Sequence, residues 1–264
     1  MIIKINNGYL HYDKKGQGIP ILFIHGYPLS REIWVPQFDN LFDQALLLSL
    51  DLRGHGDSFP FEGPYTMDLL AADCKRLLEE INIKQPILVC GLSMGGYVTM
   101  AMYRRYPQLF RGMILTSTRA GSDSPEGKAD RDVSIQTVLE HGSVHIADSM
   151  IQKIVSPATL SLKPELIEMI HGIMAKTSVQ GIVGALQGMK DRLDSTELLS
   201  QIRCPVLIVH GIDDQLIPIK EAEIMHQHID NSHLVLIDEA GHLPNLEQPE
   251  RFNQAIRDFM LSLP

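Results

Sequence analysis

Short, uninterrupted runs of apolar residues recur along this chain, and they limit its fold more than any other feature. They occupy residues 20–24, 45–50, 86–90, 113–115, 205–209 and 233–237. A strand buried on both faces reads as a continuous apolar run, which is typical of a parallel sheet. Between these runs, apolar residues recur at helical spacing over residues 67–81, 94–106, 219–229 and 252–261. The alternation predicts an α/β fold, with a mostly parallel sheet flanked by helices on both faces.

The first fifteen residues differ, because apolar and polar residues alternate there. Residues 2–5 and 9–12 read as two short strands, and Asn7 and Gly8 between them are a hairpin signal. Antiparallel strands are joined by such tight turns, whereas parallel strands need a longer crossover. We therefore expect an antiparallel hairpin at the start of the sheet.

The alternation of strands and helices is interrupted between residues 119 and 196. Residues 120–132 are polar, and the remainder is rich in methionine and isoleucine at helix-like spacing, without a strong strand. This block predicts a helical insertion. Residues 1–118 and 197–264 then form the α/β core, and the chain as a whole is one domain, since large α/β folds of this length commonly are.

Composition and charge exclude several classes of protein. The 264 residues carry a formal net charge of −9, and an acidic surface repels phosphate backbones, so we expect no nucleic-acid partner. No apolar run approaches the roughly 20 residues that span a bilayer, and the N-terminus lacks the pattern of a signal peptide. We therefore expect no membrane association and a cytoplasmic location. The choice between a monomer and a small homo-oligomer stays open.

The three cysteines, Cys74, Cys90 and Cys204, are scattered among apolar residues. An odd number without regular spacing does not read as a disulfide framework, and no pair has the spacing of metal ligands. Each is expected to pack as a small apolar side chain in a reducing compartment. We predict no metal site.

Ser93 lies in the sequence GLSMG (91–95), directly after a predicted buried strand and directly before a predicted helix. A serine there needs a very tight turn, and glycines at both ends of the motif remove side chains that would clash. The turn lifts the hydroxyl above the sheet and points main-chain N–H groups of the helix start toward the same space. This context favours a nucleophile over an incidental serine in a glycine-rich turn.

A serine hydroxyl becomes a good nucleophile only when a base takes its proton, and in this kind of turn the acid and then the histidine follow the serine along the chain. Of eleven histidines, only His242 lies both beyond a strand end and after an acidic candidate. Asp213 and Asp214 follow the preceding strand. Adjacent side chains point in different directions, so only one of them can face His242, and the residues alone leave that choice open.

Attack on a carbonyl also needs hydrogen-bond donors for the oxyanion. The main-chain N–H of Met94, immediately after the serine, is one candidate. The turn after the strand at residues 21–24 supplies the second, the N–H of Tyr27 in HGYP (25–28). The alternative is that HGYP is only a loop. Because both donors are main-chain groups, their side chains are not evidence for this role.

Taken together, the motifs resemble the α/β-hydrolase superfamily over nearly the whole chain. The matching segments are HGYP (25–28), DLRGHGDS (51–58), GLSMGG (91–96), GIDDQLIP (211–218) and GHLPNLEQPE (241–250). In that family the acid lies three residues after the first glycine of the fourth segment. The resemblance therefore selects Asp214 and implies a triad of Ser93, Asp214 and His242. It also implies an oxyanion hole at the main chain of Tyr27 and Met94, and makes residues 119–196 a helical cap.

Within the superfamily the chain is most similar to small carboxylesterases and to 3-oxoadipate enol-lactonase-like hydrolases. We therefore expect hydrolysis of a small carboxylic ester through an acyl-enzyme, without metal or organic cofactor, and a lactonase as the alternative. Other acyl or carbon–carbon bond hydrolysis, perhydrolysis and a slowly turning-over ligand receptor are less favoured. The Met and Ile residues of the cap indicate an apolar, adaptable acyl pocket, although plain helix packing explains them equally well.

Overall fold

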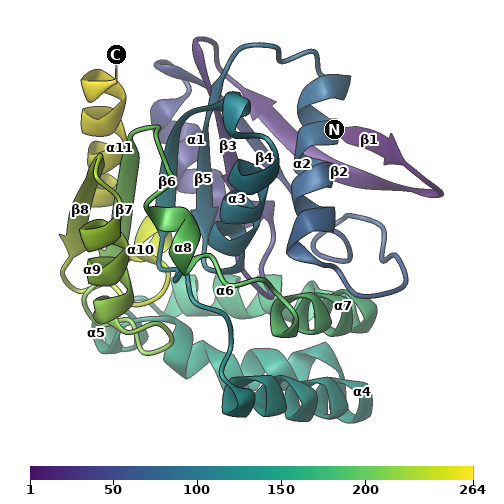
Figure 1. Cartoon of the computed structure of the whole chain (residues 1–264). Helices are drawn as coiled ribbons and strands as arrows, with labels where there is room; N and C mark the ends of the chain where they lie inside the picture. The colour runs from purple at the N-terminus through teal and green to yellow at the C-terminus, as the bar shows by residue number, and fades with distance from the viewer. Residues whose placement is uncertain (264) are drawn as a thin grey trace.

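The computed structural model describes residues 1–263, and within them it contains an eight-stranded sheet. The strands follow the order β1-β2-β4-β3-β5-β6-β7-β8 across that sheet (Figure 1). Their bounds are β1 Ile2–Ile5, β2 Gly8–Lys15, β3 Ile19–Ile24, β4 Ala45–Leu50, β5 Ile87–Leu92, β6 Phe110–Thr116, β7 Val206–Gly211 and β8 Ser232–Ile237. The predicted α/β fold is confirmed, because β3 to β8 all pair in parallel.

The N-terminal strands form the expected antiparallel hairpin, in which Ile5 pairs with Gly8. β2 continues past the predicted end at residue 12 and reaches Lys15. Its second half pairs antiparallel with β4, where Tyr12 lies opposite Leu50. The longer strand therefore arises from a partner that is distant in sequence, which the local alternation does not reveal.

β3 lies inside the sheet, between β4 and β5, and its side chains point alternately into the two apolar cores on either face of the sheet. Leu22 and Ile24 belong to the core on one face, and Ile21 and Phe23 belong to the core on the other. All four side chains are fully buried. Burial on both faces explains why this segment reads as a continuous apolar run.

Helices cover both faces of the sheet (Figure 1). These helices, with the short ones beside them, are η1 Arg31–Trp34, α1 Val35–Leu41, α2 Met67–Glu80, α3 Met94–Arg105, η2 Pro107–Leu109, α8 Thr196–Leu199, α9 Ile219–His228, α10 Pro244–Glu247 and α11 Pro249–Ser262. Leu70 of α2, Val98 of α3 and Met225 of α9 reach the core on one face, and Leu41 of α1 and Phe259 of α11 reach the core on the other.

Four further helices lie between β6 and β7 and form a layer beyond one end of the sheet, at the bottom of Figure 1. We call them the α4–α7 layer: α4 Pro125–Ile154, α5 Pro157–Leu162, α6 Pro164–Lys176 and α7 Val179–Lys190. α4 begins earlier than the helix-like pattern indicates, because Ser124 caps it through the N–H of Gly127 and Pro125 suits the first turn. Gly142, with φ of 80°, interrupts it.

Residues 1–263 contain no helix of the length and apolar character that crossing a membrane requires. Nor do they contain a group of three His, Cys, Asp or Glu side chains that could hold a metal ion. The three cysteines are free. Burial raises the pKa of each thiol, so Cys74, Cys90 and Cys204 stay protonated at neutral pH.

Candidate active site

Ser93 occupies the turn between β5 and α3 in a strained backbone conformation. Its φ is 55° and its ψ is −114°, a region that non-glycine residues rarely adopt and that costs about 1–3 kcal/mol. The flanking glycines allow the turn to be this tight. A Cβ at Gly91 would lie 2.3 Å from the carbonyl oxygen of Gly95, and one at Gly95 would lie 2.1 Å from that of Ile24.

The strand next to this turn holds it in place. The N–H of Ser93 donates to the carbonyl oxygen of Thr116 at 2.9 Å, and the hydroxyl of Thr118 donates to the carbonyl oxygen of Ser93 at 2.8 Å. Both threonines are fully buried. Strain of this kind persists only where surrounding contacts determine the conformation, and these two hydrogen bonds supply them at the carboxyl end of β6.

His242 and Asp214 meet beyond the carboxyl ends of the neighbouring strands β8 and β7. Nδ1 of His242 lies 2.8 Å from Oδ2 of Asp214. The other carboxylate oxygen accepts hydrogen bonds from the N–H groups of Leu216 at 2.8 Å and Ile217 at 3.0 Å. Asp213, by contrast, is exposed. Of the two adjacent acids, Asp214 is therefore the one that contacts the histidine.

The carboxylate of Asp214 is held in its ionised form. Burial raises its pKa, but the charge and hydrogen bond of His242 and the N–H of Ile217 together bring that pKa below its usual value. A second buried histidine is His210, whose Nε2 lies 3.6 Å from Oδ2 of Asp214, the oxygen that also contacts His242. Nε2 of His210 donates to the carbonyl oxygen of Ile217, and burial lowers the pKa of its imidazole. A carboxylate on Nδ1 of His242 leaves Nε2 as the nitrogen available to a reacting group.

A buried carboxylate, that of Glu247, fastens the loop that carries His242. Oε1 of Glu247 accepts from the N–H groups of Gly241 at 2.9 Å and Leu243 at 3.1 Å, the residues on either side of the histidine. Oε2 accepts from the N–H of Ser156 at 2.7 Å, between α4 and α5. This one side chain, fully buried, therefore joins the His242 loop to the α4–α7 layer.

Ser93 and His242 line the same cavity, which has a volume of about 320 Å³. The core contributes Tyr27 as well, and the α4–α7 layer contributes the apolar side chains of Met150, Leu186 and Met189. The cavity therefore lies between the carboxyl end of the sheet and the layer of helices. Ligands of open α/β sheets bind in this crevice, and the volume suits a small molecule.

The turn after β3 also approaches Ser93 closely. A Cβ at Gly26 would lie 2.8 Å from Cδ2 of Leu92 and 3.1 Å from the Cβ of Ser93, so a larger residue there would force neighbouring atoms to shift. Tyr27 follows directly, and its main-chain N–H and that of Met94 take part in no hydrogen bond within residues 1–263. The residues that directly follow Gly26 and Ser93 therefore each carry a main-chain donor without an acceptor.

Charged side chains line the cavity too, which the prediction of an apolar acyl pocket did not include. They are Arg119, Asp123, Asp130 and Arg131. Arg119 and Asp123 follow β6 within a few residues, and polar residues just beyond a strand end were a usable signal. Arg131 lies on α4 and had no such signal. Glu247 was not predicted either, because its role depends on contacts with residues that are distant in sequence.

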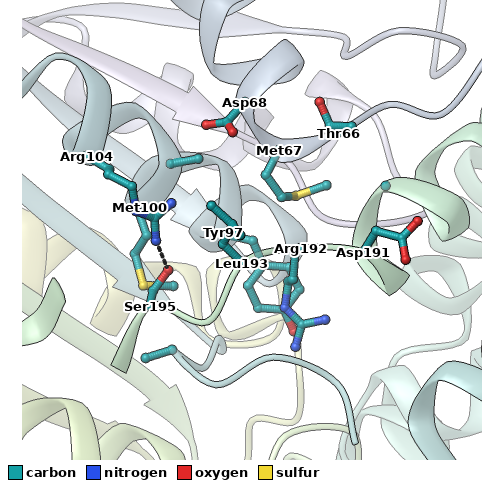
Figure 2. A pocket seen from close by; sticks show the side chains of 13 residues that line it. Thr66, Met67, Asp68, Tyr97, Met100, Arg104, Asp191, Arg192, Leu193 and Ser195 are labelled. Carbon is teal, nitrogen blue, oxygen red and sulfur yellow. Dashed lines mark hydrogen bonds between the residues drawn. The ribbon is translucent and has the colours of Figure 1, made fainter. Parts of the chain in front are cut away.

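A second cavity, of about 250 Å³, shares Tyr97 with the first. Figure 2 shows it with Arg192 beside Tyr97, and the Arg192 guanidinium carbon stands 4.2 Å from the centre of the Tyr97 ring. Across the cavity, Arg104 donates to the hydroxyl of Ser195 at 2.8 Å. Neither Ser93 nor His242 lines this space, so it lies outside the candidate active site.

Comparison with known protein families gives an independent reading of the chain. A model of the alpha/beta hydrolase family matches residues 21–255. A 3-oxoadipate enol-lactonase from Acinetobacter baylyi is 28% identical over 240 residues, which cover 91% of this chain and 88% of that protein. A pimeloyl-[acyl-carrier protein] methyl ester esterase from Neisseria meningitidis is 29% identical over 249 residues, covering 91% and 93% respectively.

Among solved structures, a thermophilic esterase from Thermogutta terrifontis, determined with malate bound, is similar to this chain with a TM-score of 0.95 and 39% sequence identity. The match covers 97% of this chain and 94% of the esterase. Both chains therefore share the sheet and the α4–α7 layer.

Proposed function

Since the chain belongs to the alpha/beta hydrolase family and is a hydrolase, we propose that it cleaves small carboxylic esters with Ser93, His242 and Asp214 as nucleophile, base and acid. One observation carries the proposal. The Asp214–His242 hydrogen bond orients an imidazole at the cavity that the strained Ser93 also lines. A serine, a histidine and an orienting carboxylate at one cavity are the parts that acyl transfer needs.

In the first half of the reaction, Nε2 of His242 takes the hydroxyl proton as Oγ of Ser93 attacks the ester carbonyl carbon. His242 then gives that proton to the alcohol oxygen as the carbon–oxygen bond breaks, leaving an acyl group on Ser93. In the second half, water attacks the acyl carbon, and His242 passes the water proton to Oγ as the carboxylic acid departs. Asp214 stays ionised throughout, holds the tautomer of His242 and stabilises its charged form.

We assign the oxyanion hole to the main-chain N–H groups of Tyr27 and Met94. Their support is the close approach of Gly26 to Ser93 and the absence of another acceptor for either N–H within residues 1–263. Donors placed in advance where negative charge develops cost no reorganisation during the reaction.

We also propose that residues 119–196 act as a cap over a core made of residues 1–118 and 197–264. The cavity supports this division, because the core supplies Ser93 and His242 while residues 119–196 supply all the arginine and aspartate side chains of its lining and part of the apolar ones. Substrate choice is then a property of the cap. The buried, unpaired thiols of Cys74 and Cys90 favour the cytoplasm as its location, since thiols stay reduced there.

A lactonase is the second candidate, because an enol-lactonase is among the relatives. The bond broken and the three residues are the same, but the leaving alcohol stays attached to the acyl group. A panel of linear esters and five- and six-membered lactones, compared by kcat/KM, separates the two functions.

The direct test is Ser93→Ala, assayed on p-nitrophenyl butyrate, with Ser161→Ala on the exposed face of α5 as the matched control. We expect a loss of at least about a thousandfold in kcat for the first variant and no change for the second. A fluorophosphonate should add its mass to the wild-type chain and not to Ser93→Ala. Full turnover by Ser93→Ala would overturn the proposal.

A further inference from the structure

Three arginines converge on one buried carboxylate at the cavity. Only 1% of the Asp123 side chain is exposed, and it pairs with Arg119 Nη2 at 2.5 Å, with Arg192 Nη1 at 2.8 Å and with Arg131. Burial raises the pKa of Asp123, but hydrogen bonds and charge from Arg131 and Arg192 bring it to about 2. The carboxylate is therefore ionised at neutral pH, and the cluster carries an excess of two positive charges.

Two of these guanidinium groups belong to the cavity that contains Ser93 and His242. Arg119 and Arg131 line that cavity and keep 29% and 18% of their side chains exposed. Arg192 is only 2% exposed and lines the second cavity, beside Tyr97 (Figure 2). A ligand next to Ser93 can therefore contact Arg119 and Arg131, whereas Arg192 does not line this cavity.

The hydrogen-bonding capacity of the cluster is not used up. A guanidinium has five N–H donors, and one carboxylate cannot satisfy three such groups. Nε of Arg119 is buried without an acceptor among residues 1–263. A buried donor without an acceptor destabilises the unliganded site. Asp130, the other acid lining the cavity, is exposed, so water screens its charge.

Another part of the cavity is apolar, where Met150, Leu186 and Met189 line it. A neutral acyl chain could use only that part and would offer no acceptor to the guanidinium donors that Asp123 leaves unused. A carboxylate on the substrate would use both parts, because planar guanidinium groups bind carboxylates through paired hydrogen bonds.

We propose that the substrate is an ester or lactone that carries a second, ionised carboxylate, and that Arg119 and Arg131 bind this carboxylate. The inference rests on the proposed function, because it names the substrate class of the same site. The carboxylate does not react. Its binding places the ester carbonyl against Ser93 and selects acidic substrates over neutral ones of equal size.

The test compares monomethyl succinate, glutarate and adipate with neutral methyl esters in which an isopropyl group replaces the free carboxylate. Release of acid is followed at constant pH for both series. We expect at least one monomethyl dicarboxylate to show kcat/KM at least about tenfold above its neutral partner, since a hydrogen bond to a charged group contributes about 1.5–3 kcal/mol. This preference should shrink at high salt.

Arg131→Gln and Arg119→Gln should each lower kcat/KM for the acidic ester by about 10–100-fold. The value for the neutral ester should fall by a smaller factor, so that the ratio of the two drops, and Arg131→Lys should restore part of the preference. Arg104→Gln, in the second cavity, is the matched control and should leave the ratio unchanged. The Arg131→Lys variant and the wild-type ratio keep the test valid if a glutamine variant does not fold.

The inference fails if the wild-type protein hydrolyses every neutral ester as well as its acidic partner, or if the glutamine variants lower both activities equally, as loss of a purely structural ion cluster would. Hydrolysis of the neutral esters that depends on Ser93 would then leave the proposed function standing. Absence of hydrolysis that depends on Ser93 in both series would overturn both.

Discussion

The carboxylate of Asp214 lies 2.8 Å from Nδ1 of His242, although 28 positions separate the two residues in the chain. The neighbouring strands β7 and β8 bring them together, since each residue follows the carboxyl end of one strand. The side chain of Asp214 is 1% exposed and that of His242 is 3% exposed. The pair is therefore shielded from water and from salt, and its geometry is set by the sheet.

Replacing Asp214 by asparagine tests this relationship. The amide can still accept from Leu216 and Ile217, but an NH₂ group facing Nδ1 favours the wrong tautomer of His242. We expect kcat to fall by about 10³–10⁴-fold with the fold intact. Asp213→Asn is the matched control, because Asp213 is adjacent and exposed. Equal kcat values for the two variants would contradict the assignment.

The pH dependence of stability follows from Asp123. Its pKa of about 2 in the folded state lies below the ordinary value of 3.8, so ionisation of Asp123 stabilises the fold above about pH 4. The contribution, about 2 kcal/mol, is lost as the pH falls from 4 toward 2. Urea unfolding between pH 2 and 7 should show this loss in the wild-type protein and a shallower slope in Asp123→Asn. Identical slopes would rule out the ion cluster as the cause.

Glu247 tests how the histidine loop is positioned. In Glu247→Gln, an NH₂ group must face at least one of the main-chain N–H groups that the carboxylate now binds. We expect a loss of about 2–3 kcal/mol in the free energy of unfolding, and a lower kcat with KM nearly unchanged. Glu250→Gln, on the exposed surface nearby, serves as the control and should alter neither. A normal kcat in Glu247→Gln would show that the loop needs no such support.

Gly95 in the serine turn and Gly172 on α6 predict opposite effects of alanine substitution on stability. In Gly95→Ala, the new Cβ would lie 2.1 Å from the carbonyl oxygen of Ile24, so we expect a loss of about 3 kcal/mol or more. In Gly172→Ala, on α6, no atom lies within 4 Å of the new Cβ, and stability should rise by about 0.5–1 kcal/mol. Thermal unfolding of both variants measures the contrast. Equal effects would show that the close approach at Gly95 is unimportant.

Local patterns were sufficient for most of the core. The apolar runs, together with the alternation in the first fifteen residues, predict all the strands, and the helical spacing predicts the long core helices. Burial on two faces leaves a continuous apolar run in the sequence, and burial on one face leaves a periodic pattern. Two features depended on distant partners. β2 continues to Lys15 because β4 is available to pair with it. α4 begins at Pro125, inside a polar stretch, because it is capped by Ser124 and packs on α6 and α7.

The sequence by itself determined the serine turn and the order of its partners, because a tight strand-to-helix turn requires glycines that are visible at fixed positions. It also narrowed the acid to Asp213 or Asp214, and the family pattern then selected Asp214. Only the tertiary structure decided which side chains share the cavity with Ser93. Arg119 and Arg131 reach it from a loop and from α4, and Asp123 gathers both with the distant Arg192. Such convergence depends on packing between distant segments, which leaves no period in the sequence.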